Sequence, residues 1–594
     1  MYRPNLGYGD GPRARKTYQP ETLSPPLQQS LISNEKPDKS PHNADDNMCG
    51  LPFSIAVLFL IIARITAAIQ GNISDCDETY NYWEPLHNLL YGKGFQTWEY
   101  SPVYGLRSYS YLIIHLIPAA LFNWLAGYRI MVFYGVRFYL ACLCLSGELF
   151  LCRETMRRFG KDVGLLTFLF LLFGNGMFIS SSAFLPSSFS MYMTLYSMAS
   201  WFAGRYRRAI FYTAVSTIIS WPFAGLIGLP IAIDMVFMRK DLFSFVKWSM
   251  QSLMLILAPM MAIEYYYYGK MTLPTLNIIL YNVFSSHGPD LYGTEPFSFY
   301  IYNGFLNFNI VFLSSLVVFP ICVIAYSMNQ LPNHRTLKDC FLVFLPMYLW
   351  FFIFFCQSHK EERFLFPVYP LICLAGAVFV DSVAKIVNSV WVHFHWPGPR
   401  FVASVFRYGF VLMYMFLSIA RILAILKGFS GSISAYKVFS NGNLSREWKD
   451  NVNVCVGKEW HRFPSSFFLP GNKWSLLFLK SEFRGQLPQY YASVEDNTSV
   501  IPKHMNDLNL EEESRYSPVT ACHFLVDLDL GRSTEYEPLY IHNKEDWAVY
   551  FEVPYLDVTR SPSIFRAFYF PYYSERFCSY GSYHVLKSKK RSLP

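Results

Sequence analysis

The sequence predicts an α-helical, polytopic membrane protein with about eleven transmembrane helices, followed by a C-terminal globular domain. Three observations carry this prediction: the composition, a series of apolar segments, and a change of character after residue 427. Of the 594 residues, 53% are hydrophobic, 19% are aromatic and only 15% are charged. So little charge with so many aromatic residues is typical of polytopic membrane proteins and rare in soluble ones.

The apolar segments have the length that a membrane requires. A hydrocarbon core about 30 Å thick needs roughly 20 apolar residues in a helix. The expected spans are 51–69, 130–151, 163–182, 189–203, 209–222, 223–238, 246–264, 304–326, 340–356, 365–384 and 404–426. The stretch 111–127 is ambiguous, because His115, Pro118 and Asn123 interrupt an otherwise apolar run.

The distribution of basic residues indicates whether 111–127 spans the membrane. If this stretch does not span, the Lys and Arg clusters that follow all fall on the side of the N-terminal tail. These clusters lie at 153–161, 205–208, 239–240, 335–338 and 385–400. Since loops rich in Lys and Arg remain in the cytosol, we expect 111–127 to be a juxtamembrane or re-entrant helix. The N-terminus is then cytosolic, and the odd number of spans puts the C-terminal region in the lumen.

Composition also predicts the domain boundaries. Residues 1–50 are rich in Pro, Ser, Asn and Gln and are expected to form a disordered cytosolic tail. A transmembrane domain covers 51–427, with its first lumenal loop at 71–110. The segment 428–594 is more polar and contains short strand-like pieces, HFLVDLDL and WAVYFEV. It is expected to be a lumenal globular domain of mixed or mostly β structure.

Charge and cysteine usage exclude some classes of protein. The net charge is +8, but no long run of Lys and Arg offers a surface for nucleic acid. The twelve cysteines show no CxxC pairs and lie mostly in apolar runs, which favours buried thiols over a metal site or a disulfide framework. The cysteines that could meet an oxidising lumen are Cys76, Cys455, Cys522 and Cys578. Three glycosylation sequons agree with the predicted sides: Asn72, Asn443 and Asn497, of which Asn72 is expected to be too near the membrane for modification.

Two polar islands are predicted on the lumenal face. The first, residues 75–109, reads DCDETYNYWEPLHNLLYGKGFQTWEYSPVYGLRSY and holds five acidic residues together with Trp83 and Trp98. Aromatic rings can cover the C–H face of a sugar while carboxylates accept its hydroxyl protons. The alternative is a solvated loop at the lipid interface, where Trp and Tyr gather in any case.

The second island, QSHKEERFLFP at 357–367, lies between two predicted spans. Ionisable residues at such a position indicate a functional site. The cations His359, Lys360 and Arg363 suit a phosphate group, since Arg offers a bidentate fork and Lys a point charge. The alternative is a loop whose charges pair among themselves.

These motifs together resemble a known family. DETYNYWEPLHNLLYGKGFQTWEYSP, the following RSY and the later HKEERFLFPVYPL closely resemble the dolichyl-phosphate-mannose-dependent mannosyltransferases of the endoplasmic reticulum, glycosyltransferase family twenty-two. The sequence looks most like the branch that forms α-1,2 linkages in the lipid-linked oligosaccharide for asparagine-linked glycosylation. The resemblance runs from about 51 to 580. Where the family commonly has His-Pro-Asp-Glu, this chain has Asp75-Cys76-Asp77-Glu78, so only the Asp-Glu pair carries over.

The resemblance implies a type C glycosyltransferase fold, with a lumenal active site and a groove for a polyprenyl chain. It implies that Asp77 is the catalytic base and that Glu78 shapes the acceptor site. The second motif would supply His359, Lys360 and Arg363 to the donor phosphate. The further candidates for acceptor or sugar binding are Asp75, Trp83, Glu84, Trp98, Glu99, Arg107 and Glu361.

The implied reaction is a single displacement with inversion, which needs one essential carboxylate. The donor, dolichyl phosphate mannose, carries a single phosphate, so neither a metal nor another cofactor is expected. The implied partners are this donor, a lipid-linked oligosaccharide acceptor and the lipids of the endoplasmic reticulum membrane, while the sequence indicates no oligomeric state. Two alternatives remain: a sister mannosyltransferase of the α-1,6 or glycosylphosphatidylinositol type, and a polytopic lipid transporter.

Overall fold

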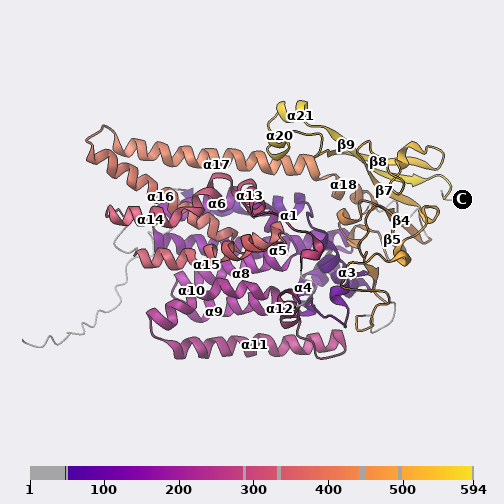
Figure 1. The fold of residues 1–594 in the computed structure, drawn as a ribbon, viewed down its shortest axis with the longest axis horizontal. Coiled ribbons are helices and arrows are strands. Elements are labelled where there is room, and N and C mark those ends of the chain that lie inside the picture. Colours follow the sequence, from indigo (N-terminus) through magenta and orange to yellow (C-terminus); the bar gives the residue numbers. More distant parts are fainter. Residues whose placement is uncertain are drawn as a thin grey trace, which may run out of the picture. The chain divides into compact units, whose positions relative to one another are not determined.

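Long apolar helices followed by a mixed β-sheet make up the computed structural model (Figure 1). The structure describes residues 47–48, 51–284, 289–330, 336–440, 444, 448, 450–492 and 498–591. All of them belong to one unit, Asn47–Pro594. Nearly all of the predicted tail 1–50 and two of the sequons, at Asn443 and Asn497, lie outside the described residues.

The helices are α1 (Phe53–Gln70), α2 (Cys76–Glu78), α3 (Glu84–Tyr91), α4 (Tyr109–Ala126), α5 (Arg129–Phe159), α6 (Lys161–Phe173), α7 (Asn175–Ser180), α8 (Pro186–Phe202), α9 (Tyr206–Val215), α10 (Leu229–Ile233), α11 (Leu242–Tyr268), α12 (Pro274–Phe284), α13 (Ser298–Leu316), α14 (Val318–Ser327), α15 (Leu337–Cys356), α16 (Tyr369–His393), α17 (Pro399–Phe429), α18 (Gly431–Lys437), α20 (Ser563–Ala567) and α21 (Tyr573–Phe577). The strands are β1 (Asn47–Met48), β2 (Leu51–Pro52), β3 (Phe95–Gln96), β4 (Val452–Val456), β5 (Trp474–Phe478), β6 (Gln489–Tyr490), β7 (Phe524–Asp529), β8 (Trp547–Leu556) and β9 (Tyr580–Ser588).

Every predicted span coincides with helical structure. Within the described residues, seven helices have the length and hydropathy to cross a membrane, and two apolar helices, Ser54–Gln70 and Pro222–Met238, are shorter. Some predicted spans are interrupted: 163–182 divides into α6 and α7 at Gly174, and α13 kinks at Asn309, whose φ is 38°. A polytopic helical chain is therefore confirmed, and the number eleven stays a prediction.

The ambiguous stretch 111–127 forms α4, which is long and apolar enough to span. Its N-terminal end is held by α11, because Ser108 Oγ donates a hydrogen bond to Glu264 (2.6 Å). The same end of α11 contacts the C-terminal region, where Thr498 Oγ1 donates to the carbonyl of Tyr267 (2.9 Å).

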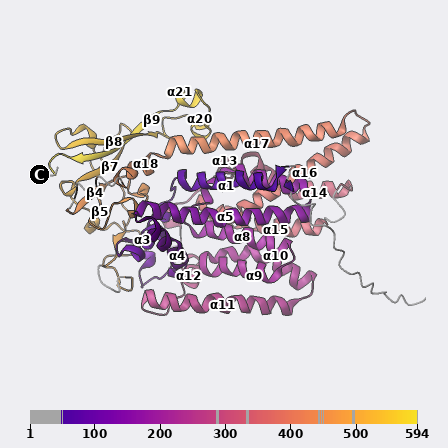
Figure 2. The ribbon, with the colours of Figure 1, turned by 180° about the vertical axis from the view of Figure 1, so that it is seen from behind.

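The other end of α4 meets the C-terminal region as well. Asn123 accepts a hydrogen bond from Tyr91 Oη (2.8 Å), and Arg129, just beyond α4, donates to Asn472 (2.6 Å). Both ends thus lie near the same region of the fold, and Figures 1 and 2 draw α4 beside α3 at that end of the helices. These contacts favour a helix that lies along one face, although its length alone permits a crossing.

The C-terminal region contains a five-stranded sheet with the order β5-β4-β7-β9-β8 among the described residues. β4 is parallel to β5 and β7, whereas β9 is antiparallel to β7 and β8. The predicted strands HFLVDLDL and WAVYFEV are β7 and β8. A mixed β structure is therefore confirmed, while its separation from 51–427 as a domain stays a prediction.

A disulfide corrects one expectation from the sequence. Cys455 at β4 and Cys522 just before β7 are bonded, with their Cα atoms 5.7 Å apart. The two cysteines stand 67 positions apart, and only the pairing of β4 with β7 brings them together. Both are among the four cysteines that could meet an oxidising lumen, but the sequence favoured buried thiols over a disulfide framework.

The loop 71–108 is fastened to the C-terminal region. β3 of this loop pairs with β6, where Phe95 faces Tyr490, and Tyr491 N–H donates to the carbonyl of Gly94 (3.0 Å). Thr79 Oγ1 also donates to the carbonyl of Phe463 (2.8 Å). Sheet pairing and buried hydrogen bonds thereby fix the acidic loop in place.

Candidate active site

A cavity of about 740 Å³ opens where the loop 71–108, the segment 357–364 and the C-terminal region meet. Nine of the sequence-predicted site residues line it. They are Asp75, Asp77, Trp98, Glu99, Arg107, His359, Lys360, Glu361 and Arg363. The fold therefore brings the two polar islands of the sequence together.

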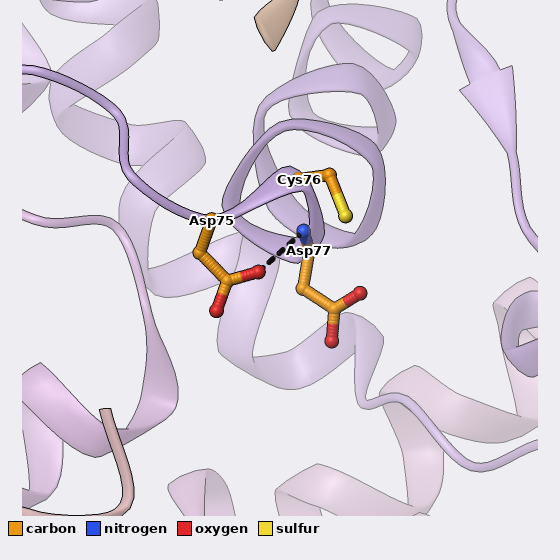
Figure 3. A group of neighbouring side chains, drawn as sticks. All are labelled: Asp75, Cys76 and Asp77. Carbon is orange, nitrogen blue, oxygen red and sulfur yellow. Dashed lines mark hydrogen bonds between the residues drawn. The ribbon is translucent and has the colours of Figure 1, made fainter. Parts of the chain in front are cut away.

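The first island presents two neighbouring carboxylates. Asp75 caps the short helix α2, since its Oδ1 accepts a hydrogen bond from the backbone N–H of Asp77 at 2.9 Å (Figure 3). A π-helical turn, Thr79–Trp83, follows α2 directly and leads into α3. Both aspartates lie at the start of this helical segment and line the cavity. The N-cap position also explains why an Asp stands at position 75, since an Asp side chain is a good acceptor for the first free N–H groups of a helix.

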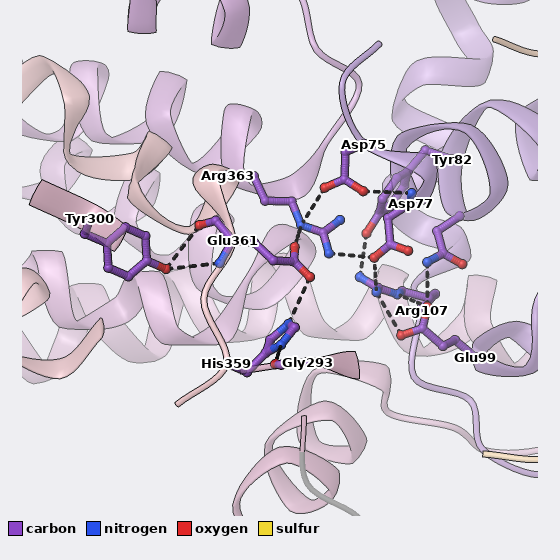
Figure 4. A network of polar contacts seen from close by, with 11 residues as sticks. Asp75, Asp77, Tyr82, Glu99, Arg107, Gly293, Tyr300, His359, Glu361 and Arg363 are labelled. Atoms are coloured by element: carbon purple, nitrogen blue, oxygen red, sulfur yellow. Dashed lines mark hydrogen bonds and ion pairs between the residues drawn. The ribbon is translucent and has the colours of Figure 1, made fainter. Parts of the chain in front are cut away.

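Arg363 of the second island binds both aspartates (Figure 4). Its Nη2 lies 2.6 Å from Asp77 Oδ2 and its Nε lies 3.1 Å from Asp75 Oδ2. The same Nε also contacts the carboxylate of Glu361. One guanidinium therefore opposes three acidic groups in a largely buried position, where the side chain of Arg363 is 12% exposed.

A second guanidinium approaches Asp77 from the other side. Arg107 Nη2 is 3.5 Å from Asp77 Oδ2, and it is held by Glu99 at 2.8 Å and by Tyr82 Oη at 2.7 Å from Nη1. Glu99 also accepts a hydrogen bond from Asn81 (2.6 Å). Arg107 is thus fixed in position, and Asp77 lies between two cations.

These surroundings shift the pKa values of the two aspartates in opposite directions. Burial raises the pKa of Asp75 to about 7, against the opposing effect of Arg363. Burial also acts to raise the pKa of Asp77, but Arg363 and Arg107 outweigh it, so the pKa of Asp77 lies below its usual value. Asp77 is accordingly ionised at neutral pH and can accept a proton.

His359 adds a further positive charge. Its Nε2 is 3.0 Å from Glu361 Oε1 and its Nδ1 is 2.8 Å from the carbonyl of Gly293. Both partners are acceptors, so the imidazolium satisfies them both. Burial alone would lower the pKa of His359, but the hydrogen bonds to Glu361 and Gly293 raise it above its usual value.

Lys360 and Glu361 are held by backbone contacts. Lys360 Nζ donates to the carbonyl oxygens of Glu295 (2.8 Å) and Gln357. The backbone of Glu361 is clamped by Tyr300, whose hydroxyl donates to its carbonyl (3.1 Å) and accepts from its N–H (3.3 Å). The charged segment is therefore preorganised before any ligand binds.

Three predicted site residues do not line the cavity. Glu78 is buried and accepts hydrogen bonds from Trp83 Nε1 and from the N–H of Phe184, both at 3.0 Å. Trp83 is fully buried and packs on Phe133, with ring centroids 4.3 Å apart. Their positions do not support contact with a substrate, and they pack and orient the acidic loop instead.

Glu84 is the third. It is fully buried and accepts hydrogen bonds from the N–H of Phe95 (3.2 Å), from the N–H and Oγ of Ser466 (2.6 and 2.9 Å), and from Ser465 Oγ (3.1 Å). A buried carboxylate with this many donors is a structural anchor. Glu84 therefore ties the acidic loop to the C-terminal region, and a contact with sugar is not supported.

Sequence reasoning missed the contribution of the C-terminal region to the cavity. Its lining residues include Trp460, Phe483, Gln486, Met505 and Asn509. No local pattern distinguishes them, because they come from separate turns of an irregular region. The apolar part of the cavity was also not assigned to residues, and Trp221, Phe223, Leu226, Ile353 and Phe354 line it.

The acidic group at the start of α2 has one geometric feature of a metal site. Ligand atoms of Asp75, Cys76 and Asp77 lie within 4.8 Å of one another. Both carboxylates, however, are already paired with Arg363, and Asp75 Oδ1 accepts the N–H of Asp77. A cation would have to displace the guanidinium, so these residues do not fit a metal ion well.

Comparison with known proteins gives consistent matches. The model of the Alg9-like mannosyltransferase family matches residues 55–470. The protein named alpha-1,2-mannosyltransferase ALG9 from Homo sapiens is 46% identical over 544 residues, which cover 90% of this chain and 89% of that protein. Alpha-1,2-mannosyltransferase Alg9 from Drosophila melanogaster is 41% identical over 543 residues, covering 89% and 86%. The crystal structure of ArnT from Cupriavidus metallidurans bound to undecaprenyl phosphate matches with a TM-score of 0.46 and 12% identity, over 72% of this chain and 85% of that one.

Proposed function

This chain belongs to the Alg9-like mannosyltransferase family and is an α-1,2-mannosyltransferase of lipid-linked oligosaccharide assembly, and we propose that its donor is dolichyl phosphate mannose and its base Asp77. The observation that carries the proposal is the pairing of the ionised Asp77 with Arg363 in the cavity. One carboxylate beside one fixed cation is what transfer from a sugar phosphodiester requires.

The chemistry at the acceptor needs a base. Asp77 takes the proton of the acceptor hydroxyl as its oxygen attacks the anomeric carbon of mannose. The C–O bond to phosphate breaks in the same displacement, which inverts the configuration and needs no nucleophilic carboxylate. Asp75, with its raised pKa, acts as a neighbour that shares Arg363.

The leaving group needs positive charge. The departing dolichyl phosphate gains negative charge as the bond breaks, and Arg363 lines the cavity where it can stabilise this charge. His359 contributes through its charge, because both of its ring nitrogens are bound to Glu361 and Gly293. Lys360 lines the same cavity, although its ammonium group is bound to backbone carbonyls. Because a monophosphate leaves with less charge than a diphosphate, these side chains suffice without a metal ion.

The apolar part of the cavity suits the lipid. Trp221 packs against Trp350 and Phe364, with ring centroids 5.5 Å from each. Trp221 and Phe364, together with Phe223, Leu226 and Ile353, line the cavity and offer an aromatic and aliphatic surface to a polyprenyl chain. The fold that we propose is accordingly of glycosyltransferase type C, in a multi-pass protein of the endoplasmic reticulum membrane with its active site in the lumen.

The test is transfer of mannose from dolichyl phosphate mannose to a defined lipid-linked oligosaccharide by the purified protein, with and without a chelator. We expect Asp77→Asn to lower kcat by about 10²–10⁴-fold while the donor still binds. Asp162→Asn is the matched control, because its carboxylate is 58% exposed and pairs with Arg407 away from the cavity.

The outcomes separate the alternatives. A product that resists an α-1,2-specific mannosidase would favour a sister transferase, and activity lost with the chelator would overturn the metal-free mechanism. Full activity of Asp77→Asn would remove Asp77 as the base. If the unmutated protein transfers no mannose from dolichyl phosphate mannose, the proposed donor is wrong.

A further inference from the structure

The C-terminal region forms one wall of the active-site cavity. Trp460, Phe483, Gln486, Met505 and Asn509 all line it. They combine aromatic rings with side-chain amides, whereas the part of the cavity near α15 is lined by apolar side chains. The cavity therefore has two chemically different surfaces.

The aromatic part of this wall contacts the turn that carries Asp77, which consists of α2 and Thr79–Trp83. The rings of Trp460 and Phe483 pack with centroids 4.6 Å apart. Tyr80, three positions after Asp77, donates a hydrogen bond from its hydroxyl to the carbonyl of Trp460 (2.8 Å) and packs on its ring at 6.0 Å. Tyr80 therefore links Trp460 to the turn that carries Asp77.

The loop 71–108 supplies a second aromatic surface. Trp98 lines the same cavity and packs on Tyr104 and Tyr281, with ring centroids 5.2 and 5.3 Å away. Asp507 of the C-terminal region joins this surface, since it accepts hydrogen bonds from Tyr104 (3.3 Å, to Oδ1) and Tyr281 (3.4 Å, to the carbonyl). Asp507 thus fastens the aromatic surface around Trp98 to the C-terminal region, which also carries Trp460.

The amide part of the wall is preorganised. Asn509 Oδ1 accepts the backbone N–H of Gln486 (3.0 Å), and Gln486 Oε1 accepts the N–H of Asn506 (3.2 Å). Gly485 permits this close packing, because a Cβ there would lie 2.3 Å from the ring of Phe483 and 2.6 Å from Asn509 Oδ1. Two turns of the chain, 483–486 and 504–509, therefore hold each other in one conformation.

We propose that this wall recognises the acceptor glycan, with Trp460 and Asn509 as determinants of acceptor binding. The inference rests on the proposed function and deepens it. The donor presents one sugar, a phosphate and a lipid, and the cations suit the phosphate while the apolar surface suits the lipid. The acceptor is an oligosaccharide rich in hydroxyls and C–H faces, which aromatic rings and amides bind well. The wall from the C-terminal region combines the two, since the rings of Trp460 and Phe483 and the amides of Gln486 and Asn509 line the same cavity.

The test measures the KM for the lipid-linked acceptor and the KM for the donor separately, using the full-length protein. For Trp460→Ala we expect the acceptor KM to rise on the order of tenfold, the effect of losing one aromatic contact, with the donor KM unchanged. Trp460→Phe keeps a ring and should restore most of the affinity. Trp448→Phe is the matched control, because Trp448 packs on Phe524 of the sheet at 5.6 Å and does not line the cavity.

Asn509→Asp provides an independent variant. The carboxylate retains an oxygen that can accept the N–H of Gln486 but loses the amide donor, so the wall keeps its conformation. For Asn509→Asp, too, we expect a raised acceptor KM and an unchanged donor KM. If Trp460→Ala does not fold, Asn509→Asp alone tests whether the wall binds the acceptor.

Two results would overturn the inference alone: an unchanged acceptor KM in both variants, or an equal rise of both KM values while the unmutated protein transfers mannose normally. If the unmutated protein fails to transfer mannose, the proposed function falls and this inference falls with it.

Discussion

Arg363 Nη2 lies 2.6 Å from Asp77 Oδ2, although the two residues stand 286 positions apart in the chain. This contact joins the two polar islands of the sequence, and the same guanidinium reaches Asp75 at 3.1 Å. The base and the cation that we assign to the leaving phosphate are therefore neighbours. A donor phosphate that binds Arg363 would lie beside the carboxylate that activates the acceptor.

Replacing Arg363 by Lys tests this arrangement. A guanidinium reaches two aspartates at once, whereas an ammonium is a single point charge. We expect Arg363→Lys to lower kcat by about ten- to a hundredfold, the equivalent of losing one charged hydrogen bond. Steady-state kinetics with saturating donor and acceptor check it. Arg407→Lys serves as the control, because it alters an ion pair with Asp162 and Asp381. Full activity of Arg363→Lys would contradict a role for the two-pronged guanidinium.

The pH dependence of the reaction should report Asp75. Burial raises its pKa to about 7, against the effect of Arg363. Above this pH Asp75 is ionised and competes for Arg363, which leaves Asp77 more basic; below it Asp75 is neutral and Arg363 acts more fully on Asp77. We therefore expect kcat/KM to fall as the pH decreases through about 7.

Asp75→Asn mimics the neutral state permanently. It should remove the inflection near neutral pH and hold kcat/KM near the low-pH value, as a pH–rate profile of the variant would reveal. Asp162→Asn should keep the inflection. A profile that is identical in Asp75→Asn and in the unmutated protein would assign the titration to another group.

Glu84 is expected to matter for stability and not for substrate binding. Glu84→Gln replaces one acceptor oxygen by an N–H₂ group that faces donors, among them the N–H of Phe95 and Ser466 Oγ. Leaving buried donors unsatisfied should lower the free energy of unfolding by about 3 kcal/mol. Thermal unfolding measures it, while both KM values of the folded fraction stay constant. Glu535→Gln, on an exposed side chain, is the control; an unchanged melting temperature for Glu84→Gln would refute the anchor.

The disulfide between Cys455 and Cys522 closes a loop with a sequence separation of 67. Cross-linking a loop of this length restricts the unfolded chain and stabilises the fold by about 4 kcal/mol. We expect Cys455→Ser to lower the melting temperature and to free one thiol, which labelling under denaturing conditions detects. Cys356→Ser, at an exposed free cysteine, should leave the melting temperature unchanged. If Cys455→Ser has the same melting temperature as the unmutated protein, the disulfide does not form.

Much of the fold could be predicted because its signals are local. The eleven apolar segments became helices and the strand-like pieces became β7 and β8, since hydrophobic length and periodicity are written in consecutive residues. The interruption at Asn309 was not foreseen, because its positive φ depends on packing, where its side chain donates to Ser418 of α17 (3.0 Å). The contacts at both ends of α4, which favour a position along one face, are long-range and are not recorded in hydropathy.

The sequence by itself determined the class of the protein, its two charged motifs and the residue types that the chemistry needs, because these features are contiguous in the chain. Only the tertiary structure decided which of those residues share a cavity. Asp77 meets Arg363, while Trp83 and Glu84, a few residues further along the same loop, turn into the interior. The wall with Trp460 likewise arises from separate turns of the chain between residues 460 and 509. Burial and pairing of this kind depend on long-range packing, and no local pattern in the sequence specifies them.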